Sequence, residues 1–134
     1  MEKRDVVLVV EGDDLERMQA LDAIEKRTMG SWGCCAAVNP AEGILKLHTK
    51  IQLNIVGVLC ALRFPGLKGV EDILRLSQEC KVLGKPFLLC ISIENDNLDP
   101  DEMELLQKNG LDWVVVSEGF KNWGSAVGKF MKKA

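Results

Sequence analysis

The residues best suited to metal or phosphate chemistry form a short acidic group, Glu11-Gly12-Asp13-Asp14, directly after an apolar run. Carboxylate oxygens are preferred ligands of Mg²⁺, so a divalent cation is one hypothesis for this group. The other hypothesis is structural, because an aspartate ahead of a helix caps its first N–H groups and complements its dipole. We favour the capping role for Asp13 and Asp14.

Thiols and imidazole are the other candidates, with five cysteines and one histidine in the chain. Cys60 and Cys90 fall near the ends of two predicted inner strands and could form a redox or metal pair, but two thiols without a nearby histidine are a poor metal site. We expect both to be small core residues. Cys34-Cys35 lies in a predicted strand, where neighbouring side chains point to opposite faces. We therefore expect one of these two side chains in the core and the other on the surface. His48, late in a predicted helix, is expected to be solvated or near the helix C-terminal dipole.

Motifs of known chemistries do not occur. The chain has no GxGxxG or GxxxxGK[ST] phosphate-binding loop and no G-x-S-x-G nucleophile elbow, and no nucleophile–base pair is visible. We therefore predict no enzymatic activity, no catalytic residue, no metal and no cofactor.

Composition narrows the class of protein. The chain has 134 residues, of which 47% are hydrophobic and 28% charged, with a net charge of −3. Such a charge provides no basic field for nucleic acid or an acidic membrane surface. No apolar run approaches the ~18 residues that span a bilayer, and the start lacks a cleavable leader pattern. We predict a cytoplasmic protein with reduced cysteines.

Apolar runs and turn signals predict five strands that alternate with helices. The strands are expected at 5–10, 34–38, 53–60, 87–92 and 113–116. The central run is apolar throughout and passes through Pro65-Gly66 to a helical pattern, as in a βαβ unit buried on both faces. We predict one domain, 1–134, with a flavodoxin-like, doubly wound, five-stranded parallel sheet in the order 2-1-3-4-5 and three α/β/α layers.

The predicted helices have recognisable ends. Asn39-Pro40 and Asp99-Pro100 read as cap and first helical residue, and Gly84 is well placed to end a helix over 69–83.

Two of the predicted helices should each bury a stripe of apolar side chains. The first helix should bury Leu15, Met18, Leu21 and Ile24; the last should bury Phe120, Trp123, Val127, Phe130 and Met131.

With these elements in order, the chain resembles the receiver domains of two-component response regulators over nearly its whole length. Phe64-Pro65-Gly66-Leu67-Lys68-Gly69 is similar to the loop and helix start after the third strand of receivers, with Lys68 where the family usually has Asp. Asn109-Gly110-Leu111-Asp112 is similar to the turn before their fifth strand. The acidic group after the first strand falls where receivers keep their metal-binding carboxylates.

The resemblance also implies which residues stand at the family's phosphorylation site. These degenerate phosphoacceptor-site positions are Glu11, Gly12, Ala61, Ile91, Ser92 and Ser117. Ala61 falls at the phosphate-accepting aspartate, and a methyl group can neither attack a phosphoryl donor nor ligate Mg²⁺. Gly12 replaces the second metal-binding acid, Ile91 or Ser92 falls at the conserved hydroxyl, and Ser117 falls at the lysine. The chain therefore resembles a pseudo-receiver.

The resemblance implies a signalling domain that acts through protein–protein contact. In receivers the face of the fourth helix, fifth strand and fifth helix binds partners or a second copy. Here this interaction surface would contain Met103, Gln107, Lys108, Asp112, Trp113 and Lys121. For Trp113, the alternative is that it folds back over the sheet edge and only adds stability. The alternative function is a flavodoxin-like small-molecule-binding or acyl-CoA-synthetase-type ligase module, which residues 84–90 and 103–120 also resemble.

Overall fold

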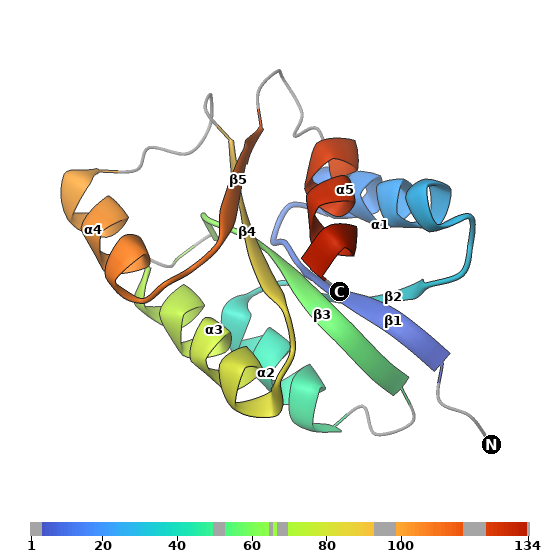
Figure 1. The fold of residues 1–134 in the computed structure, drawn as a ribbon, viewed down its shortest axis with the longest axis horizontal. Coiled ribbons are helices and arrows are strands. Elements are labelled where there is room, and N and C mark those ends of the chain that lie inside the picture. The colour runs from blue at the N-terminus through green and yellow to red at the C-terminus, as the bar shows by residue number, and fades with distance from the viewer. Residues whose placement is uncertain are drawn as a thin grey trace.

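The computed structural model describes residues 4–49, 53–64, 66, 70–92, 99–116 and 123–133. Within them strands and helices alternate along the chain, as the apolar pattern predicts (Figure 1). The elements are β1 (Arg4–Val10), α1 (Asp14–Thr28), β2 (Gly33–Ala37), α2 (Pro40–Thr49), β3 (Leu53–Ala61), α3 (Glu71–Leu83), β4 (Phe87–Ser92), α4 (Pro100–Lys108), β5 (Trp113–Val116) and α5 (Trp123–Lys133).

All the strands pair in parallel in the order β2-β1-β3-β4-β5. The central strand β3 is paired on both sides, with Cys60 opposite Val10 of β1 and Ala61 opposite Cys90 of β4. This order and the alternating helices are those of the flavodoxin-like fold, which confirms the predicted fold class.

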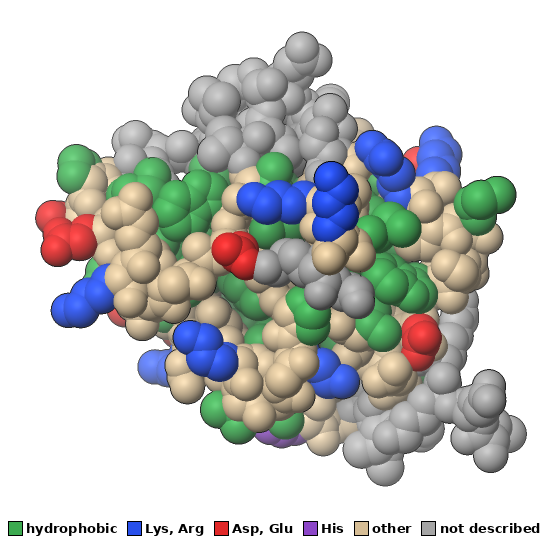
Figure 2. Space-filling view, in the orientation of Figure 1, with side chains coloured by type: hydrophobic (Ala, Val, Ile, Leu, Met, Phe, Trp, Pro, Cys, Tyr) green, Lys and Arg blue, Asp and Glu red, His purple; other side chains and the backbone are tan. Residues whose placement is uncertain are grey.

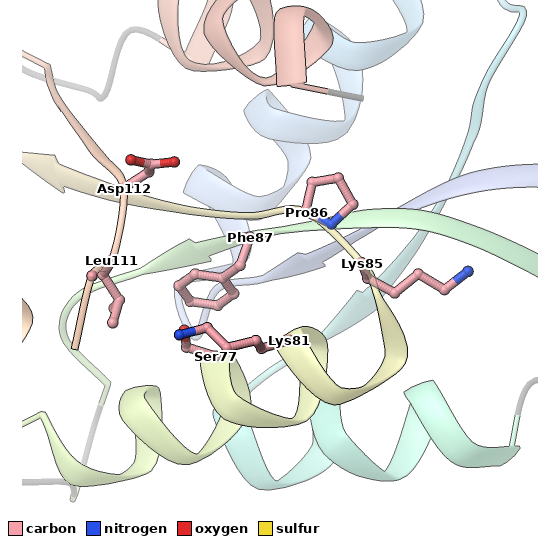
Figure 3. A pocket seen from close by; sticks show the side chains of 8 residues that line it. Ser77, Lys81, Lys85, Pro86, Phe87, Leu111 and Asp112 are labelled. Atoms are coloured by element: carbon pink, nitrogen blue, oxygen red, sulfur yellow. The ribbon is translucent and has the colours of Figure 1, made fainter.

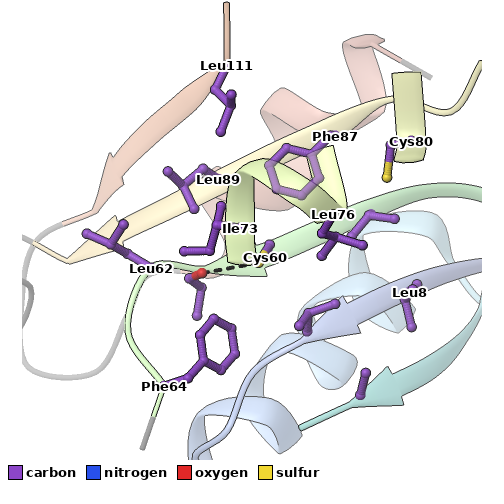
Figure 4. Close-up of a cluster of buried hydrophobic side chains, with 14 of the residues drawn as sticks. Leu8, Cys60, Leu62, Phe64, Ile73, Leu76, Cys80, Phe87, Leu89 and Leu111 are labelled. Carbon is purple, nitrogen blue, oxygen red and sulfur yellow. Dashed lines mark hydrogen bonds between the residues drawn. The ribbon is translucent and has the colours of Figure 1, made fainter. Parts of the chain in front are cut away.

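Helices cover both faces of the sheet and bury two separate clusters (Figure 1). The larger cluster joins the sheet to α2, α3 and α4, and Figure 4 shows part of it around Ile73, Leu76 and Phe87. The smaller cluster joins the opposite face to α1 and α5 through Ile24 and Phe130. Successive side chains of a strand alternate between the two clusters, except at the end of β3, where Cys60 and Ala61 both pack in the larger one.

The helix ends follow the predicted capping chemistry. Asp13 caps α1 and accepts the N–H of Glu16 at 2.9 Å. Asp99 forms a complete capping box with Glu102 at the start of α4. Gly84 ends α3 with a left-handed φ of 70°, a conformation that glycine adopts without a steric penalty.

The predicted inward side of α1 is wrong in part. Leu15 and Met18 are 47% and 66% exposed, whereas the buried positions of this helix are Glu16, Ala20, Ile24 and Thr28. Their four-residue spacing turns a different stripe toward α5. Glu16 lies in that stripe because its Oε2 accepts the indole N–H of Trp123 at 3.2 Å, and a buried carboxylate requires such a partner.

The last helix agrees better with its predicted stripe. Trp123, Val127 and Phe130 are buried in α5. Met131 is 38% exposed, so its place in the stripe is wrong; it lies next to Phe130 and on the outer side of the helix. Phe120 lies outside the described residues. Across the described ranges, none of the helices has the length and apolarity needed to cross a bilayer.

Candidate functional site

The carboxyl ends of the parallel strands meet at one edge of the sheet, where ligands gather in this class of fold. Ala61 ends β3, Ser92 ends β4 after Ile91, and Glu11 follows β1 directly. Five predicted positions, counting Gly12 after Glu11, therefore fall at this edge. Ser117 lies outside the described residues.

The acidic group at this edge is engaged in local structure. Glu11 is buried, its Oε2 accepts the N–H of Asp13 at 3.3 Å, and its carbonyl oxygen accepts Nη1 of Arg17 at 2.9 Å. Asp13 is the α1 cap, and Asp14 pairs with Arg17. In the described ranges, no group of three or more His, Cys, Asp or Glu side chains is placed to hold a metal ion. These contacts favour the capping role over the metal hypothesis.

The centre of the edge is apolar. Ala61 has no exposed surface and belongs to the larger cluster, and its carbonyl oxygen accepts the thiol of Cys60 at 3.2 Å. Ile91, in the neighbouring strand, is 5% exposed. The methyl group of Ala61 and the sec-butyl side chain of Ile91 offer no nucleophile and no metal ligand here.

A charged pair joins this edge to α4. Arg63, just beyond β3, donates through Nη1 and Nη2 to the two carboxylate oxygens of Glu102, at 2.7 and 2.8 Å. The hydrogen bonds from Arg63 hold the pKa of the Glu102 carboxyl below its usual range, with a smaller contribution from the Asp99 backbone. The sequence marked Glu102 as a capping-box acid, but nothing in it predicted a partner 39 residues away.

The predicted interaction surface is built on α4 and the start of β5. Gln107, Lys108 and Asp112 are exposed, whereas Met103 and Trp113 are half-buried. Trp113 packs against the larger cluster, and its carbonyl oxygen accepts Nζ of Lys129 from α5 at 2.7 Å. This contact ties α5 to β5. The sixth predicted residue, Lys121, is outside the described part of the chain.

The cysteines do not form a paired site. Cys60 belongs to the larger cluster and Cys90 to the smaller one, so the two thiols lie on opposite faces of the sheet. The redox or metal pairing considered for them is therefore wrong, and both are core residues. Cys35 and Cys34 likewise pack against different clusters and are each half-buried, so neither is a fully exposed surface residue. Burial raises the pKa of the Cys80 thiol to about 12, which keeps it protonated.

The histidine stands apart from this edge. His48 Nε2 lies 3.0 Å from a carboxylate oxygen of Glu79, in an exposed contact between α2 and α3. This position in the last turn of α2 agrees with a solvated residue near the helix C-terminus.

No protein-family model and no curated protein matches the chain. Solved structures do. A chemotaxis protein of Vibrio cholerae is 12% identical, with 98% of each chain covered and a TM-score of 0.67. A two-component response regulator from Cytophaga hutchinsonii is 19% identical over 98% of this chain and 97% of its own, with a TM-score of 0.66. The signal receiver domain of an HD domain-containing protein from Pseudomonas fluorescens is 10% identical over 99% and 94%, with a TM-score of 0.68. These likenesses show that the chain has the fold of response-regulator receiver domains.

Proposed function

We propose that residues 1–134 form one receiver-like signalling domain of the cytoplasm that is not phosphorylated on aspartate and acts by protein–protein contact. The observation that carries the proposal is Ala61, a fully buried alanine at the carboxyl end of the central strand. Receivers place their phosphate-accepting aspartate at this position. Among the described residues, the carboxylate that directly follows β1, that of Glu11, is buried, and its Oε2 accepts the N–H of Asp13.

The pair between Arg63 and Glu102 supports a fixed rather than a switched domain. A phosphorylated receiver shifts a two-state equilibrium. Here an ion pair whose members are 31% and 13% exposed already holds the first turn of α4 to the end of β3. A bidentate guanidinium–carboxylate pair constrains geometry as well as contributing energy. We infer that α4 keeps one position, and that its outer surface is presented continuously to a partner.

The partner face is proposed on α4, β5 and α5. Gln107, Lys108 and Asp112 provide exposed polar groups of both signs, and Trp113 provides a half-exposed aromatic. This composition suits a modest interface whose energy is concentrated in a few residues. The occupant is a protein partner or a second copy in a weak homodimer. The structural neighbours are receiver domains, which disfavours the ligase-type alternative.

One variant tests the interface. Trp113→Ala should weaken self-association or partner binding by more than ~1 kcal/mol, measured by sedimentation equilibrium or titration calorimetry. Thermal unfolding of the same variant separates the two roles of the side chain, because Trp113 also packs on the larger cluster. Gln78→Ala is the control, because this exposed position on α3 lies outside the proposed face. A Trp113 variant with reduced stability and unchanged association would remove this face from the proposal.

A further inference from the structure

A cavity of about 380 Å³ lies at the other edge of the sheet, beside the amino ends of β4 and β5. It lies between the second half of α3 and the connection from α4 to β5 (Figure 3). Pockets of about 300–1,000 Å³ are of the size that accepts small organic ligands. The cavity is separate from the carboxyl edge, because parallel strands have their two ends at opposite edges.

The cavity combines an apolar wall with a cationic rim. Phe87 and Leu111 line it, each 8% exposed, and both belong to the larger cluster. Ser77 and Lys81, one turn apart on α3, line the opposite side. In Figure 3 the ring of Phe87 points toward Ser77 and Lys81, whereas the carboxylate of Asp112 points away from them. Lys85 also lines the cavity.

The ammonium group of Lys81 is available to a ligand. Three other lysines have partners: Lys26 pairs with Asp22, Lys46 with Glu42, and Lys129 with a backbone carbonyl. Within the described ranges, neither Lys81 nor Lys85 has an ion-pair partner.

A role in neutralising the α3 dipole is the simplest alternative for these lysines. The last turn of α3 is already closed by its own backbone, because the N–H of Gly84 bonds to the Lys81 carbonyl and the N–H of Lys85 bonds to the Cys80 carbonyl. The lysine side chains are therefore not needed to satisfy these carbonyl groups.

We propose that this cavity binds a small organic anion with a flat apolar body and one acidic head group. The body would lie against Phe87 and Leu111, and the head group would meet the ammonium of Lys81 and the hydroxyl of Ser77. Charge-assisted hydrogen bonds of this kind are stronger than neutral ones. Since residues 110–112 connect α4 to β5, an occupied cavity would contact the segment that leads to β5. The site is independent of the proposed function.

The test uses two probes with the same kind of aromatic body. Anilinonaphthalene sulfonate carries an anionic head, and phenylnaphthylamine lacks it. Fluorescence titration of the full chain should give saturable one-to-one binding of the sulfonate, and Lys81→Gln should weaken it about tenfold. Amide signals of Gly110 and Leu111 should shift in proton–nitrogen NMR spectra. The neutral probe should bind at least about tenfold more weakly to the wild type.

The control variant changes a lysine in a second hollow that is also lined by basic side chains. Arg27, Lys129 and Lys132 line this second hollow between α1 and α5, and Figure 2 shows Lys and Arg side chains gathered over these helices. Lys132→Gln should leave sulfonate binding unchanged. Three results would each overturn the proposal: equal affinity for the two probes, loss of binding in Lys132→Gln but not in Lys81→Gln, or no saturable binding of the sulfonate to wild-type protein whose NMR spectrum is that of a folded protein.

Discussion

Arg63 and Glu102 form a bidentate ion pair, with nitrogen–oxygen distances of 2.7 and 2.8 Å, between the end of the central strand and the first turn of α4. Glu102 also closes the capping box of that helix by accepting the N–H of Asp99 at 3.2 Å. One carboxylate therefore both starts α4 and attaches it to the sheet edge. Leu106 is the one fully buried residue of α4, so core packing alone holds this helix at a single residue. The ion pair adds a second attachment to the sheet.

The pair should make stability depend on acid pH. The pKa of Glu102 is lowered in the folded state, so its contribution is complete above the ordinary value of about 4.3 and is lost as pH falls through the lower folded value. At pH near 7, Glu102→Gln should lower the free energy of unfolding by about 1 kcal/mol, because the pair is partly exposed. Urea denaturation should show this difference shrinking below pH of about 4.

The control for this measurement is Asp101→Asn, an exposed carboxylate in the same turn. Its loss should cost no more than a few tenths of a kcal/mol through the helix dipole, roughly the low end of such effects. If Glu102→Gln and Asp101→Asn lose the same stability at neutral pH, the ion pair contributes nothing specific to the position of α4.

Gly57 should be intolerant of a methyl group. A Cβ at this position of β3 would lie 2.2 Å from Cζ of Phe130 and 3.0 Å from the carbonyl oxygen of Pro86. Overpacking of this kind typically costs about 1–3 kcal/mol. Gly57→Ala should therefore lower the free energy of unfolding in a denaturant titration.

Gly128 of α5 is the matched glycine. The atoms nearest to a Cβ there would be those of the Arg27 guanidinium, at ordinary contact distances of 3.8–3.9 Å. Because alanine is the better helix former by roughly 0.5–1 kcal/mol, Gly128→Ala should raise stability. Equal effects of the two substitutions would show that Phe130 does not pack closely on Gly57.

The cysteines should divide by accessibility. Cys60, Cys80 and Cys90 are buried, and Cys80 is additionally held as a thiol by its raised pKa. Native protein should react with at most the two half-buried thiols, Cys34 and Cys35, and all five should react after unfolding in denaturant. Rapid native modification of Cys60 or Cys90, located by peptide mass spectrometry, would show that the larger or smaller cluster opens readily.

Restoring an aspartate should not restore a switch. Ala61→Asp would place a carboxylate where the alanine has no exposed surface, so it should destabilise the fold by about 2 kcal/mol or more. We propose that Ser117 stands where receivers have a lysine, and a hydroxyl carries no charge that could read a phosphate. Acetyl phosphate with Mg²⁺ should therefore leave the oligomeric state of this variant unchanged, with Ala61→Asn as the uncharged control. A change of oligomeric state confined to the aspartate variant would show that the switching machinery survives.

The parts of the fold that depend on local patterns were predictable from the sequence. Two-sided apolar runs marked the inner strands, and Asp99 and Gly84 marked helix ends with their own capping chemistry. The side of α1 was not predictable, because the bond between Glu16 and Trp123 that turns this helix spans most of the chain.

For the candidate site, the sequence predicted which residues lie at the sheet edge but not which side chains contact one another. Placing Glu11 and Ala61 at one edge needed no more than parallel strands. Separating Cys60 from Cys90 needed the pairing register, because Cys60 lies opposite Leu89, which packs in the larger cluster, whereas Cys90, the next residue of β4, packs in the smaller one. The pairing of Arg63 with Glu102 depends on how α4 packs, which no local pattern records.

Phosphoryl labelling of the wild-type chain tests the central claim most directly. The protein would be incubated with acetyl phosphate and Mg²⁺, beside a working receiver domain as positive control, and examined by intact-mass spectrometry. With Ala61 at the end of β3 and Glu11 and Asp13 bonded in local structure, we predict no phosphoryl adduct under conditions that label the control. An adduct that disappears in Glu11→Gln or Asp13→Asn would contradict the account, because it would place a working acceptor at this edge of the sheet.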